Sequence, residues 1–364
     1  MTGTPRVSII MAVYNAARYL REAIDSVLTQ DFTDFEFVIV DDCSSDGTPE
    51  IIAGYADPRI VYLRNERNAG QTPSLNRALR ASRGEYVARI DGDDAYRPGK
   101  LRHQVAFLDA HTDVAVCGTA AVRVDGDGRE FGLYIPPVQP QDIRFAIHHR
   151  VPVCHVSVMM RREAVVACGG YDEQYKYAAD YALWSTLLTH GYRIANLAAP
   201  LTKYREFRAS LGAVHKLGTA GDESARIIAA NAETLAHVSL PPEEARDIAL
   251  LFFPAAGLTP AAITRAYRNL RRLATASYGR LPWRIALQLR AVLFWSLLKR
   301  AMHVDVDTPA GTGRREVAAE VRRSLAKPDL ALLGAAAWLL SLAGEARIVR
   351  LKDSTLPRLM KSLR

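Results

Sequence analysis

The sequence predicts an α/β fold with a mostly parallel central sheet flanked by helices, followed by an α-helical C-terminal region. Short apolar runs rich in β-branched residues alternate with amphipathic segments of helix length over the first hundred residues, which is typical of βαβ units. Polar side chains follow several of these runs, at the strand ends where open α/β sheets bind ligands. From residue 213 onward the composition shifts to Ala, Leu and Arg, with prolines between segments of helical spacing.

The expected strands and helices alternate along the first hundred residues. Strands are expected where short runs are apolar and rich in Val, Ile and Phe: 7–13, 35–42, 59–65 and 85–91. Helices are expected where apolar residues recur at helical spacing or a proline stands in a first turn: 16–30, from Thr48 and Pro49, 72–82, and from Pro98. The following hundred residues read as mixed, with a strand at 157–162, a helix at 180–191 and a strand at 201–207.

The composition is that of a globular protein with a sizeable core. The chain has 364 residues, 49% of them hydrophobic, so more than one typical domain is expected. Its four cysteines form no C-x-x-C pair, which indicates neither a disulfide framework nor a zinc site and favours a cytoplasmic location. The N-terminal residues lack a signal-peptide pattern, and the longest apolar run, 330–343, is shorter than the roughly 20 residues that span a bilayer.

Three aspartates follow the fourth expected strand directly. Asp91 and Asp93 can point the same way, because residues i and i+2 of an extended backbone share a face, and Gly92 permits their close approach. Their carboxylates can hold Mg²⁺ or Mn²⁺ and leave coordination positions for water and for the oxygens of a diphosphate. The alternative is a solvated acidic turn with an aspartate that caps the helix near Pro98, and this is the role expected for Asp94.

A second acidic pair, Asp41 and Asp42, closes the second expected strand and leads into the turn C-S-S-D-G-T. A carboxylate there can accept a hydrogen bond from a base N–H, while the loop amides hold a ribose. The alternative is a cap for the next helix, which is the role expected for Asp46. The sequence contains no G-x-G-x-x-G motif and no P-loop, so a metal rather than a glycine-rich loop is expected to handle phosphates.

Taken together, these segments resemble the family 2 glycosyltransferases, inverting enzymes with the GT-A fold. The resemblance runs from about residue 5 to residue 212, and the order and spacing of its pieces make it specific. The pieces are VSIIMAVYN, SVLTQDFTDFEFVIVDDCSSDGT, NERNAGQTPSLNRAL, GEYVARIDGDDAYRPGKL, GGYDE and ADYALWSTLLTHGYRI.

The resemblance implies a donor nucleotide site, a metal site and a catalytic base. The residues implied for the donor nucleotide are Val13, Tyr14, Asn15, Asp42, Asn68 and Asp91. Tyr14 is expected near the base and Asp42 at the hydrogen-bonding edge of uracil or its equivalent. Asp91 and Asp93 match the D-x-D site for Mg²⁺ or Mn²⁺. Asp180 matches the base that deprotonates an acceptor hydroxyl, and the start of a helix is expected to stabilise its ionised form; its alternative role is a plain N-cap.

Two positions depart from the family pattern. Many relatives carry an acidic residue where this chain has Ala179, so the base is expected to act without that neighbour. The strand K-Y-R-E-F resembles a Y-R-x-H signature, with Phe207 in place of the histidine, which leaves the third metal ligand open. His155 or His215 can substitute for that histidine, and Arg205 is available for a phosphate.

The resemblance also implies the domain organisation. We expect a GT-A domain over 1–212, with a nucleotide-sugar-binding half at 1–100 and an acceptor-side half at 101–212, and a basic helical region over 213–364. The expected partners are a UDP-, GDP- or dTDP-sugar and a saccharide or lipid-linked acceptor. Two other functions remain open. A nucleotidyltransferase is expected to carry a basic, glycine-rich loop after the first strand, and a non-catalytic nucleotide-sugar-binding protein does not need Asp180.

The net charge of +8 is concentrated at the C-terminal end. Residues 265–364 hold 20 basic and 7 acidic side chains, so an anionic partner is expected to meet this region first. Segment 282–302 is rich in Leu, Trp and Arg, and it either rests on anionic lipid or packs as part of a helical subdomain. No nucleic-acid motif accompanies the charge, so no nucleic-acid partner is expected.

Overall fold

The computed structural model describes residues 3–207, 211–251, 259–279, 285 and 289. The chain divides into two compact units, Met1–Ile227 and Ile228–Arg364, and each is described by itself. The expectations for segments 282–302 and 330–343 fall almost entirely outside the described residues.

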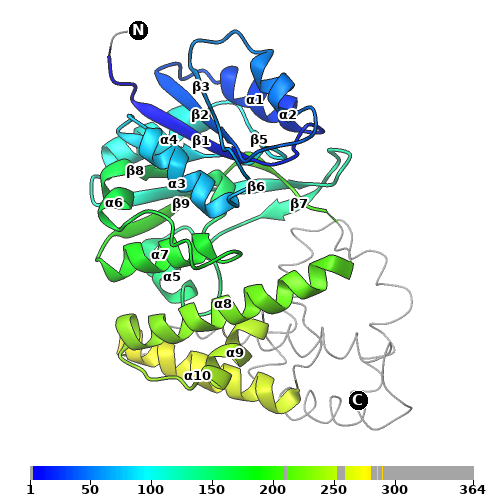
Figure 1. The fold of residues 1–364 in the computed structure, drawn as a ribbon. Helices are drawn as coiled ribbons and strands as arrows, with labels where there is room; N and C mark the ends of the chain where they lie inside the picture. The colour runs from blue at the N-terminus through cyan, green and yellow to red at the C-terminus, as the bar shows by residue number, and fades with distance from the viewer. Residues whose placement is uncertain (1–2, 208–210, 252–258, 280–284, 286–288, 290–364) are drawn as a thin grey trace, which may run out of the picture. The chain divides into compact units, whose positions relative to one another are not determined.

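One nine-stranded sheet forms the framework of the first unit (Figure 1). Its strands are β1 (Val7–Val13), β2 (Phe35–Asp41), β3 (Ile60–Arg64), β4 (Tyr86–Arg89), β5 (Ala95–Tyr96), β6 (Val114–Val124), β7 (Glu130–Tyr134), β8 (Met159–Arg161) and β9 (Arg193–Arg205). They lie in the order β3-β2-β1-β4-β8-β6-β9-β5, and β7 pairs with β6.

The sheet is parallel in its N-terminal part and mixed elsewhere. Strand β1 pairs in parallel with β2 and β4, and β2 pairs in parallel with β3, which confirms the βαβ pattern of the first hundred residues. Strand β8 is antiparallel to both β4 and β6, while β6 and β9 are parallel. The sequence analysis missed β6 and β7 and the first part of β9. Strand β6 reads V-A-V-C-G-T-A-A-V-R-V and is almost wholly buried, so it shows no alternation of polar and apolar residues.

Five of the helices described in the first unit lie near their expected positions, whereas α5 (Pro140–Ala146) and α6 (Arg162–Ala167) were not expected. The five are α1 (Leu20–Leu28), α2 (Thr48–Ala53), α3 (Gln71–Ala81), α4 (Lys100–Ala110) and α7 (Ala179–Thr189), and a 3₁₀ turn lies at His155–Ser157. Helix α1 begins four residues later than expected, because Asn15 adopts a left-handed backbone with φ of 51° and residues 14–19 form a loop. Residues of that loop, among them Tyr14 and Asn15, line a cleft at the end of β1.

The core holds the C-terminal ends of β1, β2 and β4 in place. Helix α1 buries residues at i, i+3, i+4 and i+7 spacing, namely Leu20, Ala23, Ile24 and Val27. These side chains belong to one apolar cluster with residues of β1, β2 and β4. Full burial of a Leu, Ile or Val side chain stabilises the folded state by roughly 1.5–3 kcal/mol. The cluster therefore fixes the framework from which the functional loops project.

The C-terminal region contributes three further helices, α8 (Leu211–Ala236), α9 (Pro242–Leu250) and α10 (Pro260–Tyr278). Residues of α8 up to Ile227 belong to the first unit. Within the second unit, α9 and α10 are joined by polar contacts: Arg265 Nε lies 2.6 Å from Asp247 Oδ2, and Asn269 Nδ2 lies 2.8 Å from Glu244 Oε2. Among the described helices, none combines the length and the apolar character that a membrane crossing requires.

Candidate functional site

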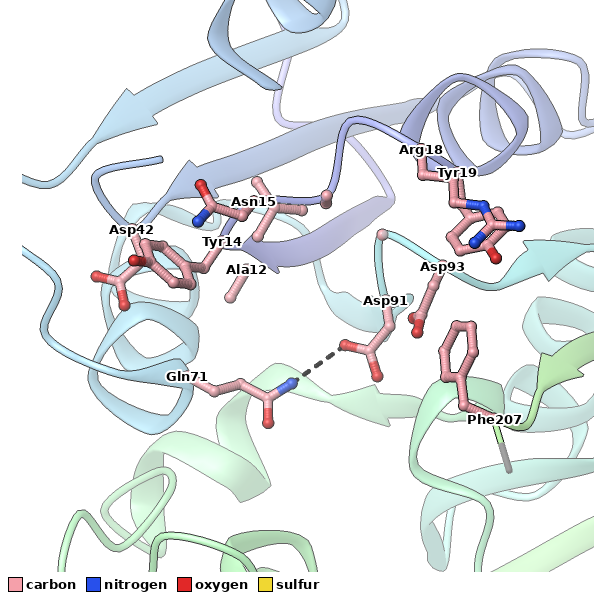
Figure 2. Close-up of a pocket in the computed structure, with 13 residues that line it drawn as sticks. Ala12, Tyr14, Asn15, Arg18, Tyr19, Asp42, Gln71, Asp91, Asp93 and Phe207 are labelled. Atoms are coloured by element: carbon pink, nitrogen blue, oxygen red, sulfur yellow. Dashed lines mark hydrogen bonds between the residues drawn. The ribbon is translucent and has the colours of Figure 1, made fainter. Parts of the chain in front are cut away.

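A cleft of about 550 Å³ opens at the C-terminal ends of β1, β2 and β4. Its lining includes six residues expected at the site: Val13, Tyr14, Asn15, Asp42, Asp91 and Asp93. Figure 2 shows Tyr14 and Asp42 on one side of this cleft and Asp91 and Asp93 on the other. Two expected site residues, Asn68 and Asp180, do not line it.

Asp42 organises the loop that leads into α3. Its carboxylate is buried, with Oδ1 accepting from Asn65 Nδ2 at 2.6 Å and from the Ala69 N–H at 2.8 Å. Oδ2 accepts from the Gly70 N–H at 2.7 Å. A carboxylate offers about four lone-pair sites, so three of them are used within the protein and one is left for a ligand. Asn68 is exposed within the loop that Asp42 holds.

Asn15 joins the loops that follow β1 and β2. Its Oδ1 accepts from the Ser45 N–H at 2.9 Å, and its own N–H donates to Ser44 Oγ at 3.0 Å. In the same turn, Asp46 Oδ1 accepts from the Thr48 N–H at 3.0 Å, while the N-cap residue of α2 is Gly47 and not Asp46. The neighbouring Tyr14 is 53% exposed and offers an aromatic face to the cleft. An aromatic face of this kind can stack on a nucleobase.

The three aspartates after β4 form a compact acidic cluster, Asp91–Asp93–Asp94. One carboxylate oxygen from each lies within 4.8 Å of the others. Burial, followed by repulsion from the neighbouring carboxylates, raises the pKa of both Asp93 and Asp94. A bound cation would relieve the repulsion between these carboxylates. Their hard oxygen donors are of the kind that Mg²⁺ and Mn²⁺ prefer.

Asp94 does not cap a helix, so the expectation for this residue was wrong. Helix α4 begins at Lys100 with Gly99 at its N-cap, which places Pro98 before the helix. Asp94 is buried instead, and its Oδ1 accepts from the Arg205 N–H at 2.7 Å. The turn G-D-D-A continues into the short strand β5, which pairs with β9, and this pairing draws Asp94 inward.

Arg205 is not available for a phosphate, contrary to expectation. Its guanidinium donates from Nε to the Asp93 carbonyl at 2.8 Å, from Nη1 to the Asp125 carbonyl at 3.0 Å and from Nη2 to Glu22 Oε2 at 2.6 Å. It also lies 4.3 Å from the ring centroid of Tyr19. Arg205 therefore supports the backbone of the acidic turn through its hydrogen bond to the Asp93 carbonyl.

Phe207, which stands where the family pattern has a histidine, lines the cleft and is 54% exposed. Figure 2 shows its ring at the same end of the cleft as Asp93. His155 is engaged elsewhere, because its Nε2 lies 2.9 Å from the Tyr171 hydroxyl and its ring packs edge-on against Trp184. The side chain of His215 lies outside the described residues. Within the described chain, Asp94 is thus the third carboxylate that lies close to the Asp91–Asp93 pair.

Arg89 is a site residue that the sequence analysis missed. It is 1% exposed, and its Nη2 donates to Asp91 Oδ1 at 2.6 Å. Its Nε and Nη1 are buried without a hydrogen-bond partner among the described residues. The signal was present in the sequence, since Arg89 is a cation inside the otherwise apolar run E-Y-V-A-R-I-D.

Arg18 and Gln71 were also missed. Gln71, the first residue of α3, donates from Nε2 to Asp91 Oδ1 at 3.3 Å across the cleft (Figure 2). Arg18 is exposed and is the only cationic side chain among the described residues that line the cleft. Nothing in the local sequence marks either residue, because both are ordinary polar residues at a helix start or in a loop.

Asp180 is the second residue of α7 and is partly buried. Its Oδ1 accepts from the adjacent Tyr181 N–H at 2.8 Å. Burial raises the pKa of this carboxyl, and the Tyr181 N–H and the charge of Arg89 oppose that rise without cancelling it. The net direction is opposite to the one expected from the helix terminus alone. A carboxylate with a raised pKa is a stronger proton acceptor than an ordinary aspartate.

Comparisons with known proteins agree with this geometry. The profile described as "Glycosyl transferase family 2" matches residues 8–170. The chain is 36% identical over 211 residues to EpsE of Bacillus subtilis (strain 168), named as a glycosyltransferase, covering 57% of this chain and 75% of that protein. It is 32% identical over 202 residues to the succinoglycan biosynthesis protein ExoO of Rhizobium meliloti (strain 1021), covering 52% of this chain and 58% of that protein.

The solved structure of S. aureus TarS 1–349 in complex with UDP-GlcNAc has the same fold, with a TM-score of 0.54 at 20% identity, covering 88% of this chain and 90% of that chain. This likeness confirms the predicted GT-A architecture. With its match to EpsE over three quarters of that relative, the chain belongs to glycosyl transferase family 2 and is a glycosyltransferase.

Proposed function

We propose that the protein is an inverting, metal-dependent glycosyltransferase that moves a sugar from a nucleotide-sugar to a hydroxyl of a saccharide or lipid-linked acceptor. The observation that carries this proposal is the arrangement of one cleft, which has Tyr14 and Asp42 on one side and Asp91 and Asp93 on the other, with the buried Asp94 in the same acidic cluster. A nucleoside diphosphate has matching parts, a planar base at one end and two phosphates at the other.

The nucleotide is assigned to the loops after β1 and β2. Tyr14 stacks on the base, Asp42 accepts a base N–H with its remaining lone pair, and Val13 and Asn15 form the floor beside them. Asn68 lies on the loop that Asp42 holds and contacts the ligand only at the edge of the site. Arg18 is assigned to the diphosphate, because it is the exposed cation of the lining.

The acidic cluster is assigned to a divalent cation, Mg²⁺ or Mn²⁺. Asp91 and Asp93 are the ligands carried over from the sequence, and Asp94 is the third oxygen donor. When bound, the cation neutralises negative charge on the departing nucleoside diphosphate. Arg89 and Gln71 orient Asp91, since both donate to its Oδ1.

Asp180 is assigned as the base. Its carboxylate takes the proton of the acceptor hydroxyl as the oxygen forms a bond to the anomeric carbon, on the face opposite the diphosphate. The bond from that carbon to the diphosphate oxygen breaks in the same displacement, so the nucleoside diphosphate leaves with the electron pair. A single displacement inverts the anomeric configuration.

The acceptor belongs to the synthesis of a cell-surface polysaccharide or glycolipid in this proposal. Three relatives are named for succinoglycan, teichuronic acid and amylovoran biosynthesis, which supports a polysaccharide product. We place the enzyme in the cytoplasm, in peripheral contact with the membrane through its basic C-terminal region. The exposed residues Arg268, Arg271 and Arg272 of α10 support that contact, since α10 contains no acidic residue.

Donor binding tests the proposal. UDP-, GDP- and dTDP-sugars are screened for an increase in melting temperature with and without Mn²⁺, since a ligand that binds only the folded state stabilises it by mass action. One donor class is expected to stabilise the protein, and only with the cation present. If no nucleotide-sugar stabilises the protein under either condition, the proposed donor site is wrong.

A further inference from the structure

The segment before α7 is held by residues from two distant helices. On one side, Thr72 Oγ1 of α3 donates to the Tyr175 carbonyl at 3.2 Å, and Asn76 Nδ2 donates to the Tyr171 carbonyl at 2.8 Å. The residue before Thr72 is Gln71, which lines the cleft and contacts Asp91. The segment Tyr171–Ala178 therefore runs from the edge of the donor cleft to the first turn of the helix that carries Asp180.

On the other side, the same segment is held by the carboxylate of one residue of α8, Glu223. Glu223 Oε1 accepts from the Lys176 N–H at 3.1 Å, and Oε2 accepts from the Tyr177 and Ala178 N–H groups at 2.9 Å each. Glu223 is 4% exposed. Three consecutive backbone donors thus converge on one buried carboxylate that is 45 residues or more distant along the chain.

Glu223 holds the backbone that leads into α7, since Lys176 and Tyr177 precede the helix and Ala178 is its N-cap residue. The first N–H groups of a helix lack partners within the helix, and a carboxylate at that end is stabilised by the helix dipole. The N-cap residue of α7 is Ala178, which has no side chain able to accept a hydrogen bond. Of the three N–H groups that Glu223 accepts, only that of Ala178 belongs to the end of α7, and the Asp180 carboxylate accepts from the Tyr181 N–H in the first turn.

We propose that Glu223 is a positioning residue for the base, an inference that rests on the assignment of Asp180 under the proposed function. By fixing the backbone of Lys176–Ala178, Glu223 fixes the first turn of α7 and with it the direction of the Asp180 carboxylate. The first part of α8 is then part of the catalytic machinery. The functional domain extends past residue 212, in keeping with the first compact unit, which ends at Ile227.

Loss of Glu223 is therefore expected to lower the rate of transfer and to leave the affinity for the donor unchanged. A base displaced by about 1 Å can cost on the order of 100-fold in rate, while ligand contacts elsewhere are unchanged. The donor cleft is built from the loops after β1, β2 and β4, none of which Glu223 contacts.

The experiment compares Glu223→Ala, Glu223→Gln and Asp180→Asn in the full-length protein with saturating Mn²⁺. Initial rates with the donor identified by the stabilisation screen give kcat and KM, and calorimetry gives the donor Kd. We expect Glu223→Ala to lower kcat about 10- to 100-fold with donor Kd within about 2-fold of wild type. Glu223→Gln keeps one acceptor oxygen and is expected to recover part of that loss. Glu233→Ala, at an exposed position of the same helix, is the matched control and is expected to match wild type.

The outcomes separate the assignment of Asp180 as the base from the positioning role of Glu223. If Asp180→Asn retains wild-type kcat, the base assignment itself fails. If Asp180→Asn is inactive while Glu223→Ala folds and has wild-type kcat, only the positioning role of Glu223 is overturned. A loss of donor affinity equal to the loss of kcat in a folded Glu223→Gln variant also overturns it, because that pattern indicates a general structural effect. Where Glu223→Ala does not fold, the split between kcat and Kd in Glu223→Gln decides.

Discussion

At the residue scale, the acidic cluster is the feature that sequence reasoning located best and described least completely. Asp91 and Asp93 were predicted as a pair, and both line the cleft. The third member, Asp94, was expected to be a cap, because sequence spacing alone does not show that the turn folds inward to meet the N–H of Arg205. Burial and then the neighbouring carboxylates raise the pKa of Asp93 and Asp94, so their ionised forms are costly without a compensating positive charge.

Asp93→Asn tests this cluster. Removing one charged oxygen donor is expected to abolish the increase in melting temperature that Mn²⁺ gives to wild type, because a neutral amide binds a hard cation weakly. Thermal unfolding with increasing Mn²⁺ measures the effect. Asp46→Asn is the control, since Asp46 accepts from the Thr48 N–H at the start of α2 and is not part of the cluster. An unchanged response to Mn²⁺ in Asp93→Asn argues that the cation binds elsewhere.

Asp180 gives a pH dependence whose sign follows from its raised pKa. The base must be ionised to accept a proton, so kcat is expected to fall as pH falls through a value above the usual 3.8 of an aspartate. The profile is measured with saturating donor and Mn²⁺. A kcat that does not change from neutral pH down to pH 3.8 contradicts the assignment.

The same shift has the opposite effect on stability. A carboxyl whose pKa is raised by folding favours the folded state when protonated, and this contribution is lost as pH rises through the folded pKa. Asp180→Asn is therefore expected to raise the melting temperature at neutral pH while it removes activity. Differential scanning fluorimetry of the two proteins at neutral and acid pH checks this, and the gain should shrink at low pH.

Arg89 is the residue whose loss is expected to damage the fold most. Arg89→Met leaves the Asp91 carboxylate, which is 23% exposed, without its 2.6 Å partner, and loss of a hydrogen bond to a charged group costs about 1.5–3 kcal/mol. Urea unfolding measures the change in free energy. Arg102→Met, which breaks an exposed pair with Asp31, is the control and is expected to leave the midpoint unchanged. Equal midpoints for the two variants show that Arg89 is not held as described.

At the scale of the elements, the N-terminal half could be predicted and the second half only in part. Strand β1 was predicted to its exact bounds, because a short run that is apolar except for Ser8 has few other interpretations. Strand β9 was expected at 201–207 and begins at Arg193, because its central A-A-P has low β propensity and only pairing with β6 makes it extended.

Contacts between elements explain what the sequence could not show about the site. Asn15 meets Ser44 and Ser45, and Asp42 meets Asn65 and Gly70, across gaps of 23 or more residues in the chain. These loops adjoin only because β1, β2 and β3 are parallel neighbours whose C-terminal ends share one edge. The position of polar residues at strand ends was predictable, whereas the partners of each carboxylate were not.

Arg205 allows a test at this scale, because it joins β9 to α1, to the acidic turn and to the carbonyl of Asp125. Arg205→Lys is expected to lower the unfolding free energy by about 2 kcal/mol, since one ammonium cannot replace three donors held in a planar fork. Lys203→Met is the control, because Lys203 meets the same Glu22 only at 3.7 Å and is partly exposed. Urea denaturation of both variants measures this difference, and an Arg205→Lys variant as stable as wild type contradicts the bridging role.

At the scale of the whole molecule, the chain combines the sheet that carries the cleft with C-terminal helices, of which α10 is basic. The expectation that the domain ends at residue 212 followed the extent of the family resemblance. The first compact unit instead includes α8 as far as Ile227, and Glu223 lies within that stretch. A sequence boundary drawn where motifs end does not reveal a contact made by one glutamate from an otherwise ordinary amphipathic helix.

The central claim is that a divalent cation at the Asp91–Asp93–Asp94 cluster is required for transfer of the sugar from a nucleotide-sugar donor. The most direct measurement is the rate of nucleoside diphosphate release from the stabilising donor, followed as EDTA is added and Mn²⁺ is then restored in excess. We predict that release stops with the chelator and returns with the metal. Release that continues at an undiminished rate in EDTA contradicts the account.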